Sequence, residues 1–275
     1  MKVYFVGAGP GDPDCLTVKA RRVLRECRII VYAGSLVSPG VMDVVPEEAE
    51  RYDSAAMNLE EIIAVFHNAR KRDIDVVRLH SGDPSIYGAI REQMNALDGL
   101  GISYEVIPGI SAFQAAAAVL ATELTAPEVS QTVILTRAPG RTPVPEGQGL
   151  SELARSRATL CIYLSGKKIK TMVKTLIPHY GEDCPAAVVY HASWPDEKVA
   201  RGRLADIAAK VDHAQLGQTS VIFVGRALSR DVPASKLYNA EFSHGFRKAK
   251  RKKKGQRNAE TDHPVTRAFG EEKKT

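Results

Sequence analysis

Residues 1–13, MKVYFVGAGPGDP, decide how this chain folds. Residues 2–6 are mostly apolar or aromatic and are followed by Gly7, a pattern that predicts a short buried strand. The next turn is rich in glycine and proline, and the apolar periodicity of residues 16–27 predicts a helix after it. A strand, a glycine-rich turn and a helix are typical of a ligand site at the carboxyl edge of an α/β sheet.

The glycine-rich turn does not match a dinucleotide-binding fingerprint. Asp12 stands where the third glycine of G-x-G-x-x-G is required, and Pro10 lacks the backbone N–H that a phosphate would use. The next predicted strand, residues 29–32, runs into Ala33 and Gly34 instead of the acidic residue that binds a ribose. A nicotinamide cofactor is therefore disfavoured.

The composition is that of a globular protein without membrane segments. The chain has 275 residues, 44% hydrophobic and 25% charged, which suffices for one large domain or two modest ones. No apolar run approaches the roughly 18 residues of a membrane span, and the chain enters a strand at once, so no signal peptide is expected. Four separated cysteines without metal-ligand spacing predict free thiols, no bound metal and a cytoplasmic location.

The formal charge of +6 is concentrated at the end of the chain. Residues 245–275 hold eleven Lys or Arg and four Asp or Glu, which leaves residues 1–244 with a net charge of about −1. Such a basic run is typical of a disordered, solvated tail. No aromatic residues interleave with it to stack on bases, so nucleic acid is not expected as a partner.

Strands and helices are predicted to alternate after the first turn, with strands at 29–32, 75–79 and 104–107 and helices at 59–71, about 85–97 and 112–121. Ser38, Asn58 and Ser111 are predicted helix N-caps. The alternation predicts right-handed βαβ crossovers and a mostly parallel sheet. Three of the turns that follow strands carry clusters of glycine, proline and aspartate, so we expect these clusters to meet at one edge.

The second half of the chain predicts a mixed sheet. Two neighbouring short strands, 186–191 and 198–202, have no helix between them and are expected to pair antiparallel. The fold class is therefore α/β, with three predicted parts: an N-terminal domain (1–122), a C-terminal domain (123–232) and the basic tail (233–275).

The chain resembles the tetrapyrrole methylase family in several linked motifs, which are together more specific than a lone glycine turn. In the family's order they are GAGPGDP (7–13), YAGSLV (32–37), SGDPSIYG (81–88), PGISA (108–112), ASWPDE (192–197) and GQTS (217–220). The last two are similar to the branch that acts at C11 of precorrin-4 or cobalt-precorrin-4, and the resemblance covers roughly residues 1–230.

The resemblance implies a two-lobed fold with the active site in the cleft between a mostly parallel N-terminal sheet and a mixed C-terminal sheet. It implies an S-adenosylmethionine-dependent C-methyltransferase of cobalamin biosynthesis, with S-adenosylhomocysteine as product and (cobalt-)precorrin-5 as the methylated tetrapyrrole. It also implies a homodimer. Methyl transfer from a sulfonium to carbon is an in-line displacement that depends on proximity and alignment.

The resemblance assigns the cofactor to segments of both halves. The cofactor-binding residues that it implies are Pro10, Ser81, Gly82, Asp83, Ile86, Ser111, Ala112, Leu164, Ala192, Thr219 and Ser220. Asp83 is the one strongly polar member, and its alternative role is that of a loop aspartate that bonds its own backbone ahead of Pro84.

No general base is evident. Related enzymes that act on uroporphyrinogen carry an Asp after the second strand and a later Lys, where this chain has Ala33 and Ser54. This difference argues against the uroporphyrinogen step. His80 and Tyr87 flank Asp83 and are the candidate catalytic residues, with local hydrogen bonding as their alternative role.

A tetrapyrrole substrate carries many carboxylates, which suit basic side chains. The predicted substrate-binding residues are Arg137, Arg141, Lys167 and Lys168, with Trp194 as a lining residue of the trough. Solvated surface charges, and core packing for Trp194, are the alternatives. His191 has a pKa range suited to proton transfer, but nothing else in the sequence supports that role.

Three other functions remain open at this stage. The chain could methylate another tetrapyrrole position or substrate, such as uroporphyrinogen III or another precorrin, which product mass and carbon NMR would distinguish. A nucleic-acid-associated factor would lose binding when residues 245–275 are deleted. A non-enzymatic tetrapyrrole carrier would bind without turnover. The sequence does not determine whether the substrate carries cobalt.

Overall fold

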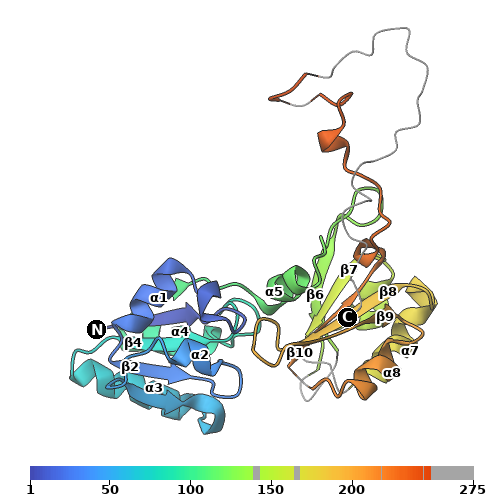
Figure 1. The fold of residues 1–275 in the computed structure, drawn as a ribbon. Helices are drawn as coiled ribbons and strands as arrows, with labels where there is room; N and C mark the ends of the chain where they lie inside the picture. Colours follow the sequence, from blue (N-terminus) through green and yellow to red (C-terminus); the bar gives the residue numbers. More distant parts are fainter. Residues whose placement is uncertain (139–142, 164–167, 218, 244, 249–275) are drawn as a thin grey trace, which may run out of the picture. The chain divides into compact units, whose positions relative to one another are not determined.

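The computed structural model describes residues 1–138, 143–163, 168–217, 219–243 and 245–248 (Figure 1). The chain divides into two compact units, Met1–Pro233 and Ala234–Thr275. The described part of the first unit contains two five-stranded sheets with helices packed on them. In the second unit, the described structure includes a short 3₁₀ turn, Lys236–Tyr238.

The first sheet is entirely parallel, as the alternating pattern predicts, and its strand order is β3-β2-β4-β1-β5. Its strands are β1 (Lys2–Gly7), β2 (Ile29–Tyr32), β3 (Glu50–Asp53), β4 (Val76–His80) and β5 (Ser103–Ile107). The helices of this half are α1 (Val18–Arg25), α2 (Pro39–Met42), α3 (Leu59–Lys71), α4 (Arg91–Leu100) and α5 (Ala112–Val119). Alternating side chains of the strands pack against α1 and α2 on one face and against α3 and α4 on the other.

The helix starts follow local sequence rules. Ser38 caps α2 and is followed by Pro39 at the first helical position. Asn58 caps α3 in a capping box with Glu61, with both hydrogen bonds formed at 2.9 and 2.7 Å. Ser111 is the N-cap of the alanine-rich α5. The three predicted caps are confirmed.

The second sheet is mixed and has the order β6-β7-β10-β8-β9. Its strands are β6 (Val133–Arg137), β7 (Thr159–Tyr163), β8 (Pro185–Tyr190), β9 (Lys198–Arg203) and β10 (Ser220–Val224), and its helices are α6 (Leu150–Ala154), α7 (Ile169–Tyr180) and α8 (Ile207–His213). β6 and β7 pair in parallel, whereas the other neighbours are antiparallel. The expected antiparallel pairing of β8 with β9 is confirmed.

The predicted helix over residues 85–97 is wrong in its first half. α4 begins only at Arg91, and the chain before it is tightly turned, with φ of +56° at Tyr87 and +48° at Ala89. A Cβ on Gly88 would lie 2.1 Å from the carbonyl oxygen of Pro84, so this turn requires glycine. Left-handed conformations at Tyr87 and Ala89 are uncommon for such residues and concentrate at functional sites.

One strand was not expected from the sequence. The sequence of β3 is ERYD, which is less apolar than the other strands of the sheet. β3 is an edge strand and pairs only with β2, so polar residues are tolerated there. In the residues that the structure describes, none of the helices combines the length and the apolar character that crossing a bilayer requires.

Candidate active site

Three turns meet at the carboxyl edge of the first sheet with their backbones in direct contact. A Cβ on Gly109 would lie 2.2 Å from the carbonyl oxygen of Gly82 and 2.9 Å from Cα of Gly7. These glycines end or follow β5, β4 and β1, respectively. Only residues without side chains allow this approach, so the expected convergence of the three clusters is confirmed.

Hydrogen bonds fix the turn after β1 to the turn after β4. The N–H of Ala8 donates to the carbonyl of His80 at 2.7 Å. Gly9 and Gly82 exchange two backbone hydrogen bonds, of 3.2 and 2.8 Å, and both have positive φ values near +65°. The proline-containing turn is therefore a rigid extension of the sheet edge.

Asp83 joins the turn after β4 to the turn after β5. Its Oδ2 accepts from the N–H of Gly109 at 2.9 Å, and its Oδ1 accepts from the N–H of Ser85 at 2.8 Å and from the Ser85 hydroxyl. Burial raises the pKa of this carboxyl, but the hydrogen bonds from Ser85 and Gly109 outweigh burial and leave the pKa below its usual value. Asp83 is thus ionised and holds the two turns together.

A cavity of about 310 Å³ opens beside these turns, within the size range of small-molecule sites. Ten of the predicted site residues line it: His80, Ser81, Gly82, Asp83, Ile86, Tyr87, Ser111, Ala112, Thr219 and Ser220. They come from the edge of the first sheet, the start of α5 and the segment that leads into β10. Residues more than one hundred positions apart in sequence therefore share one cavity.

Other predicted residues lie elsewhere. Pro10, Ala192, Trp194 and Arg137 are absent from the cavity lining, and Lys168 lines a different hollow beside α7 and α8. Arg137 is near enough to lower the pKa of Tyr87, although burial is the larger effect and raises it. Leu164, Arg141 and Lys167 lie outside the described residues.

Pro10 and Trp194 contact each other. The indole Nε1 donates to the carbonyl of Pro10 at 2.8 Å, and a Cβ on Gly11 would lie 2.1 Å from the indole ring. Ser193 Oγ accepts from the N–H of Asp12 at 3.0 Å. The segment after β8 is therefore docked on the proline-containing turn, and Trp194 positions that turn.

His191 is held on two sides in the same segment. Its ring stacks between Tyr190 and Trp194, with centroid separations of 3.8 and 4.5 Å. Its Nδ1 lies 2.9 Å from Asp196 Oδ1, and this hydrogen bond lowers the pKa of Asp196. This arrangement gives His191 a structural role in shaping the segment that carries Trp194.

The two candidate catalytic residues differ in their surroundings. His80 is 6% exposed, its Nε2 has no hydrogen-bond partner among the described residues, and burial followed by the charge of Arg78 lowers its pKa to about 3. His80 is therefore neutral near neutral pH. Tyr87 is 48% exposed, and its ring lies 5.5 Å from that of Tyr163.

Six lining residues were missed by the sequence reasoning: Ala33, Leu36, Arg78, Gly88, Tyr163 and Val221. Tyr163 ends β7, and its hydroxyl accepts from the N–H of Phe113 at 3.1 Å, which ties the second sheet to α5. Burial raises the pKa of Tyr163 to about 12. Ala33 directly follows β2, and its position at a strand end was a usable signal.

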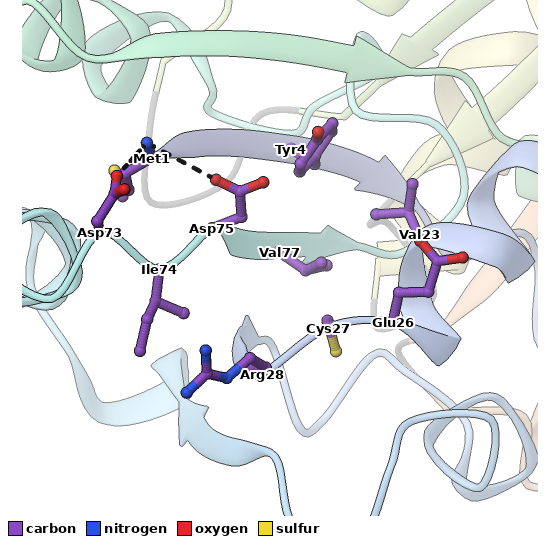
Figure 2. Close-up of a pocket in the computed structure, with 10 residues that line it drawn as sticks. All are labelled: Met1, Tyr4, Val23, Glu26, Cys27, Arg28, Asp73, Ile74, Asp75 and Val77. Atoms are coloured by element: carbon purple, nitrogen blue, oxygen red, sulfur yellow. Dashed lines mark hydrogen bonds and ion pairs between the residues drawn. The ribbon is translucent and has the colours of Figure 1, made fainter.

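A second hollow lies at the amino edge of the first sheet, away from the three turns (Figure 2). It has a volume of about 380 Å³, and two of its carboxylates pair with the amino group of the chain. The amino group of Met1 lies 2.7 Å from Asp73 and 4.0 Å from Asp75. Ligands of open α/β sheets bind at the carboxyl ends of strands, so the smaller cavity is the better candidate.

The docking of Trp194 gives a testable prediction. Trp194→Phe removes the hydrogen bond to Pro10 and is expected to weaken binding of S-adenosylhomocysteine, the ligand that the sequence resemblance implies, about fivefold, which is the worth of one neutral hydrogen bond. Calorimetry measures the affinity. Because Trp194 is the one tryptophan of the chain, its fluorescence in the unmodified protein is an independent readout of ligand binding. Equal affinity for the two proteins would show that the turn does not depend on this contact.

Comparison with known proteins gives consistent matches. The family model of the tetrapyrrole (corrin/porphyrin) methylases matches residues 2–208. A precorrin-4 C(11)-methyltransferase of Pseudomonas aeruginosa is 50% identical over 248 residues, covering 90% of this chain and 99% of that protein. A cobalt-precorrin-4 C(11)-methyltransferase of Methanocaldococcus jannaschii is 51% identical over 253 residues, covering 91% of this chain and 98% of that protein.

Solved structures agree with this similarity. The X-ray structure of a cobalamin biosynthetic enzyme, cobalt precorrin-4 methyltransferase, superposes with a TM-score of 0.81 at 42% identity, covering 83% of this chain and 96% of that one. Uroporphyrin-III C-methyltransferase from Thermus thermophilus, complexed with S-adenosylhomocysteine, gives a TM-score of 0.68 at 28% identity, covering 83% and 99%.

Proposed function

This chain belongs to the tetrapyrrole (corrin/porphyrin) methylases, and we propose that it methylates C11 of precorrin-4 or cobalt-precorrin-4. The methyl donor is S-adenosylmethionine, and the products are S-adenosylhomocysteine, a proton, and precorrin-5 or its cobalt form. The observation that carries the proposal is the cavity at the carboxyl edge of the first sheet, where nine residues of the quoted motifs lie together with His80.

The choice of C11 is supported by the similar proteins. The two relatives that are 50 and 51% identical over nine-tenths of the chain are both named for this position, and their names differ in the presence of cobalt. The relative named for uroporphyrin III is less similar, at 28% identity. Either precorrin-4 form is therefore the proposed substrate.

The cavity suits an adenosyl sulfonium donor. Its lining alternates main-chain polar groups of glycine-rich turns with small or apolar side chains, such as Ile86, Ala112 and Val221. Backbone N–H and C=O groups can bind a ribose and a zwitterion at a small cost in conformational entropy, because the turns are already held by Asp83 and by the Gly9–Gly82 pairing. The donor supplies an activated methyl group to a ring carbon.

The contribution of the protein to this reaction is alignment. The turns after β1, β4 and β5 are fixed by direct backbone contacts, which limits the movement of a bound reactant. His80 stays neutral beside the cavity, and Asp83 is engaged by three hydrogen-bond donors. The proposed mechanism is therefore displacement in a preorganised cavity without an assigned general base.

The test is product analysis. The protein is incubated with S-adenosylmethionine and, separately, with precorrin-4, cobalt-precorrin-4 and uroporphyrinogen III. We expect one added methyl group on a precorrin-4 form, located at C11 by carbon NMR. Methylation of uroporphyrinogen III alone, or at another carbon, would replace the proposal by the alternative substrate or position. Binding without turnover would instead indicate a carrier.

Deletion of residues 245–275 is expected to leave methylation unchanged within about twofold. The deleted segment carries the basic run and belongs to the second compact unit, whereas every residue of the cavity lies in the first. Steady-state kinetics of the shortened and full chains measures this. A large loss of kcat/KM, or nucleic-acid binding that survives the deletion, would contradict the interpretation of the basic run as an accessory tail.

Three further expectations stay predictions. The division into domains 1–122 and 123–232 is tested by limited proteolysis, and the homodimer by light scattering of the full chain. A cytoplasmic location is tested by fractionation of cells that express the protein.

A further inference from the structure

Arg78 is a charged residue at an unusual place. It lies on β4, the central strand of the parallel sheet, and its side chain is 7% exposed. Central parallel strands are normally continuous apolar runs, because helices cover both of their faces. A buried arginine is costly unless its charge is compensated, so its presence on this strand requires an explanation.

The partners of Arg78 are uncharged. Nε donates to Gln93 Oε1 at 3.1 Å. Nη1 donates to two main-chain carbonyls, that of Val31 at 3.3 Å and that of Leu79 at 3.5 Å. Within the described parts of the chain, no carboxylate lies within 4.0 Å of the guanidinium, and no acceptor faces Nη2. The positive charge therefore lacks a counter-ion in the protein.

Arg78 lines the cavity of the candidate active site together with His80, two residues along the same face of β4. Neither His80 nor Asp83 neutralises the positive charge of Arg78. His80 is held neutral by burial and by Arg78 itself, and both Asp83 oxygens accept hydrogen bonds from Gly109 or Ser85. Although burial lowers the pKa of Arg78 to about 10, the guanidinium remains charged at neutral pH.

We propose that Arg78 is a specificity-determining residue that binds a carboxylate of a ligand in this cavity. The inference rests on the proposed function, which supplies two ligands with carboxylates, the tetrapyrrole ring and the methionine part of the donor. The ring is favoured, because the neighbouring lining residues Ala33 and Leu36 are apolar and suit a flat ring with acidic groups at its rim. Nε and Nη1 are engaged by Gln93, Val31 and Leu79, which leaves Nη2 to donate a charge-assisted hydrogen bond to a carboxylate oxygen of the ligand.

The experiment compares the full chain with the variants R78Q, R78K and R51Q. Arg51 is the matched control, because its guanidinium also donates to main-chain carbonyls, of Val45 and Pro46, but it does not line the cavity. Binding is measured for uroporphyrin III by fluorescence quenching, and for S-adenosylhomocysteine and 5′-methylthioadenosine by calorimetry. The last compound lacks the methionine carboxylate. KM and kcat for the precorrin-4 forms and the melting temperature complete the set.

We expect R78Q to weaken uroporphyrin III binding and to raise the KM for precorrin-4 about tenfold, with both adenosyl compounds bound as before. R78K keeps the charge without the planar guanidinium that places Nη2 and should fall in between. Loss of S-adenosylhomocysteine binding with unchanged 5′-methylthioadenosine binding also supports a carboxylate site, with the donor as its source.

The proposal is overturned if R78Q lowers only the melting temperature, if it weakens both adenosyl compounds equally, or if R51Q reproduces its ligand effects. Each of these outcomes would make Arg78 a clamp between β2 and β4. If R78Q does not fold, the same binding and melting measurements on R78K decide whether Arg78 binds a carboxylate. A full chain that methylates no precorrin-4 form would refute the proposed function, while the three binding measurements would still decide the role of Arg78.

Discussion

Replacing Asp83 by alanine is expected to weaken S-adenosylhomocysteine binding at least about tenfold, while the protein still folds. The carboxylate joins the turns after β4 and β5 through Gly109 and closes its own turn through Ser85. A hydrogen bond to a charged group contributes about 1.5–3 kcal/mol, and tenfold in affinity corresponds to about 1.4 kcal/mol. Part of this loss reaches the ligand, because Asp83 lines the cavity whose shape the two turns define.

Asp53 provides the control for this substitution. It also accepts from two backbone N–H groups, those of Gly34 and Ala55, both at 2.9 Å, but it is not a lining residue of the cavity. Asp53→Ala should therefore leave S-adenosylhomocysteine affinity within about twofold of the unmodified protein, as measured by calorimetry. Unchanged affinity in Asp83→Ala would remove Asp83 from the cofactor site.

Replacing Gly109 by alanine is expected to lower the free energy of unfolding by about 3 kcal/mol. The added Cβ would lie 2.2 Å from the carbonyl oxygen of Gly82 and 2.9 Å from Cα of Gly7, and both of these are backbone atoms in fixed turns. No flexible side chain can move aside, so the turns must separate. The affinity for the cofactor should fall together with the free energy of unfolding, because separation of the turns also opens the cavity.

Gly99 is the matched control for Gly109. It lies inside α4, and a Cβ built on it meets nothing within 4 Å. Gly99→Ala should raise the free energy of unfolding by about 0.5–1 kcal/mol, since alanine is the better helix former. Urea denaturation of both variants measures the two effects. Equal stability of Gly109→Ala and the unmodified protein would contradict the close packing of the three turns.

The parts of the fold that follow local rules could be predicted from the sequence. Ser38 and Asn58 cap their helices with side chains that accept from backbone N–H groups three positions later, and Ser111 stands at the N-cap of α5. The alternation of strands and helices was sufficient to predict that the sheet is parallel and that its turns converge at one edge. Nine residues of the quoted motifs line one cavity together with His80, and their roles in binding and catalysis stay predictions.

The errors and omissions have physical reasons. Helical propensity suggested a helix from Ser85, but Gly88 and the left-handed Tyr87 hold a turn that depends on contacts with Pro84. Arg78 has the sequence context of an ordinary strand residue, and its burial becomes evident only when the helices cover the sheet.

The contact of Trp194 with Pro10 could not be read from the sequence either. It joins residues 184 positions apart, so no local pattern encodes it. Tertiary contacts of this kind determine which motif residues line the cavity and which, like Pro10 and Ala192, are not among its lining residues.

The most direct test is a crystal structure of the protein soaked with S-adenosylhomocysteine. Our account predicts ligand density at the carboxyl edge of the first sheet, against the turns that contain Ser81–Asp83 and Ser111–Ala112. Density in the hollow at the amino edge of that sheet, beside Met1 and Asp73, would contradict it (Figure 2).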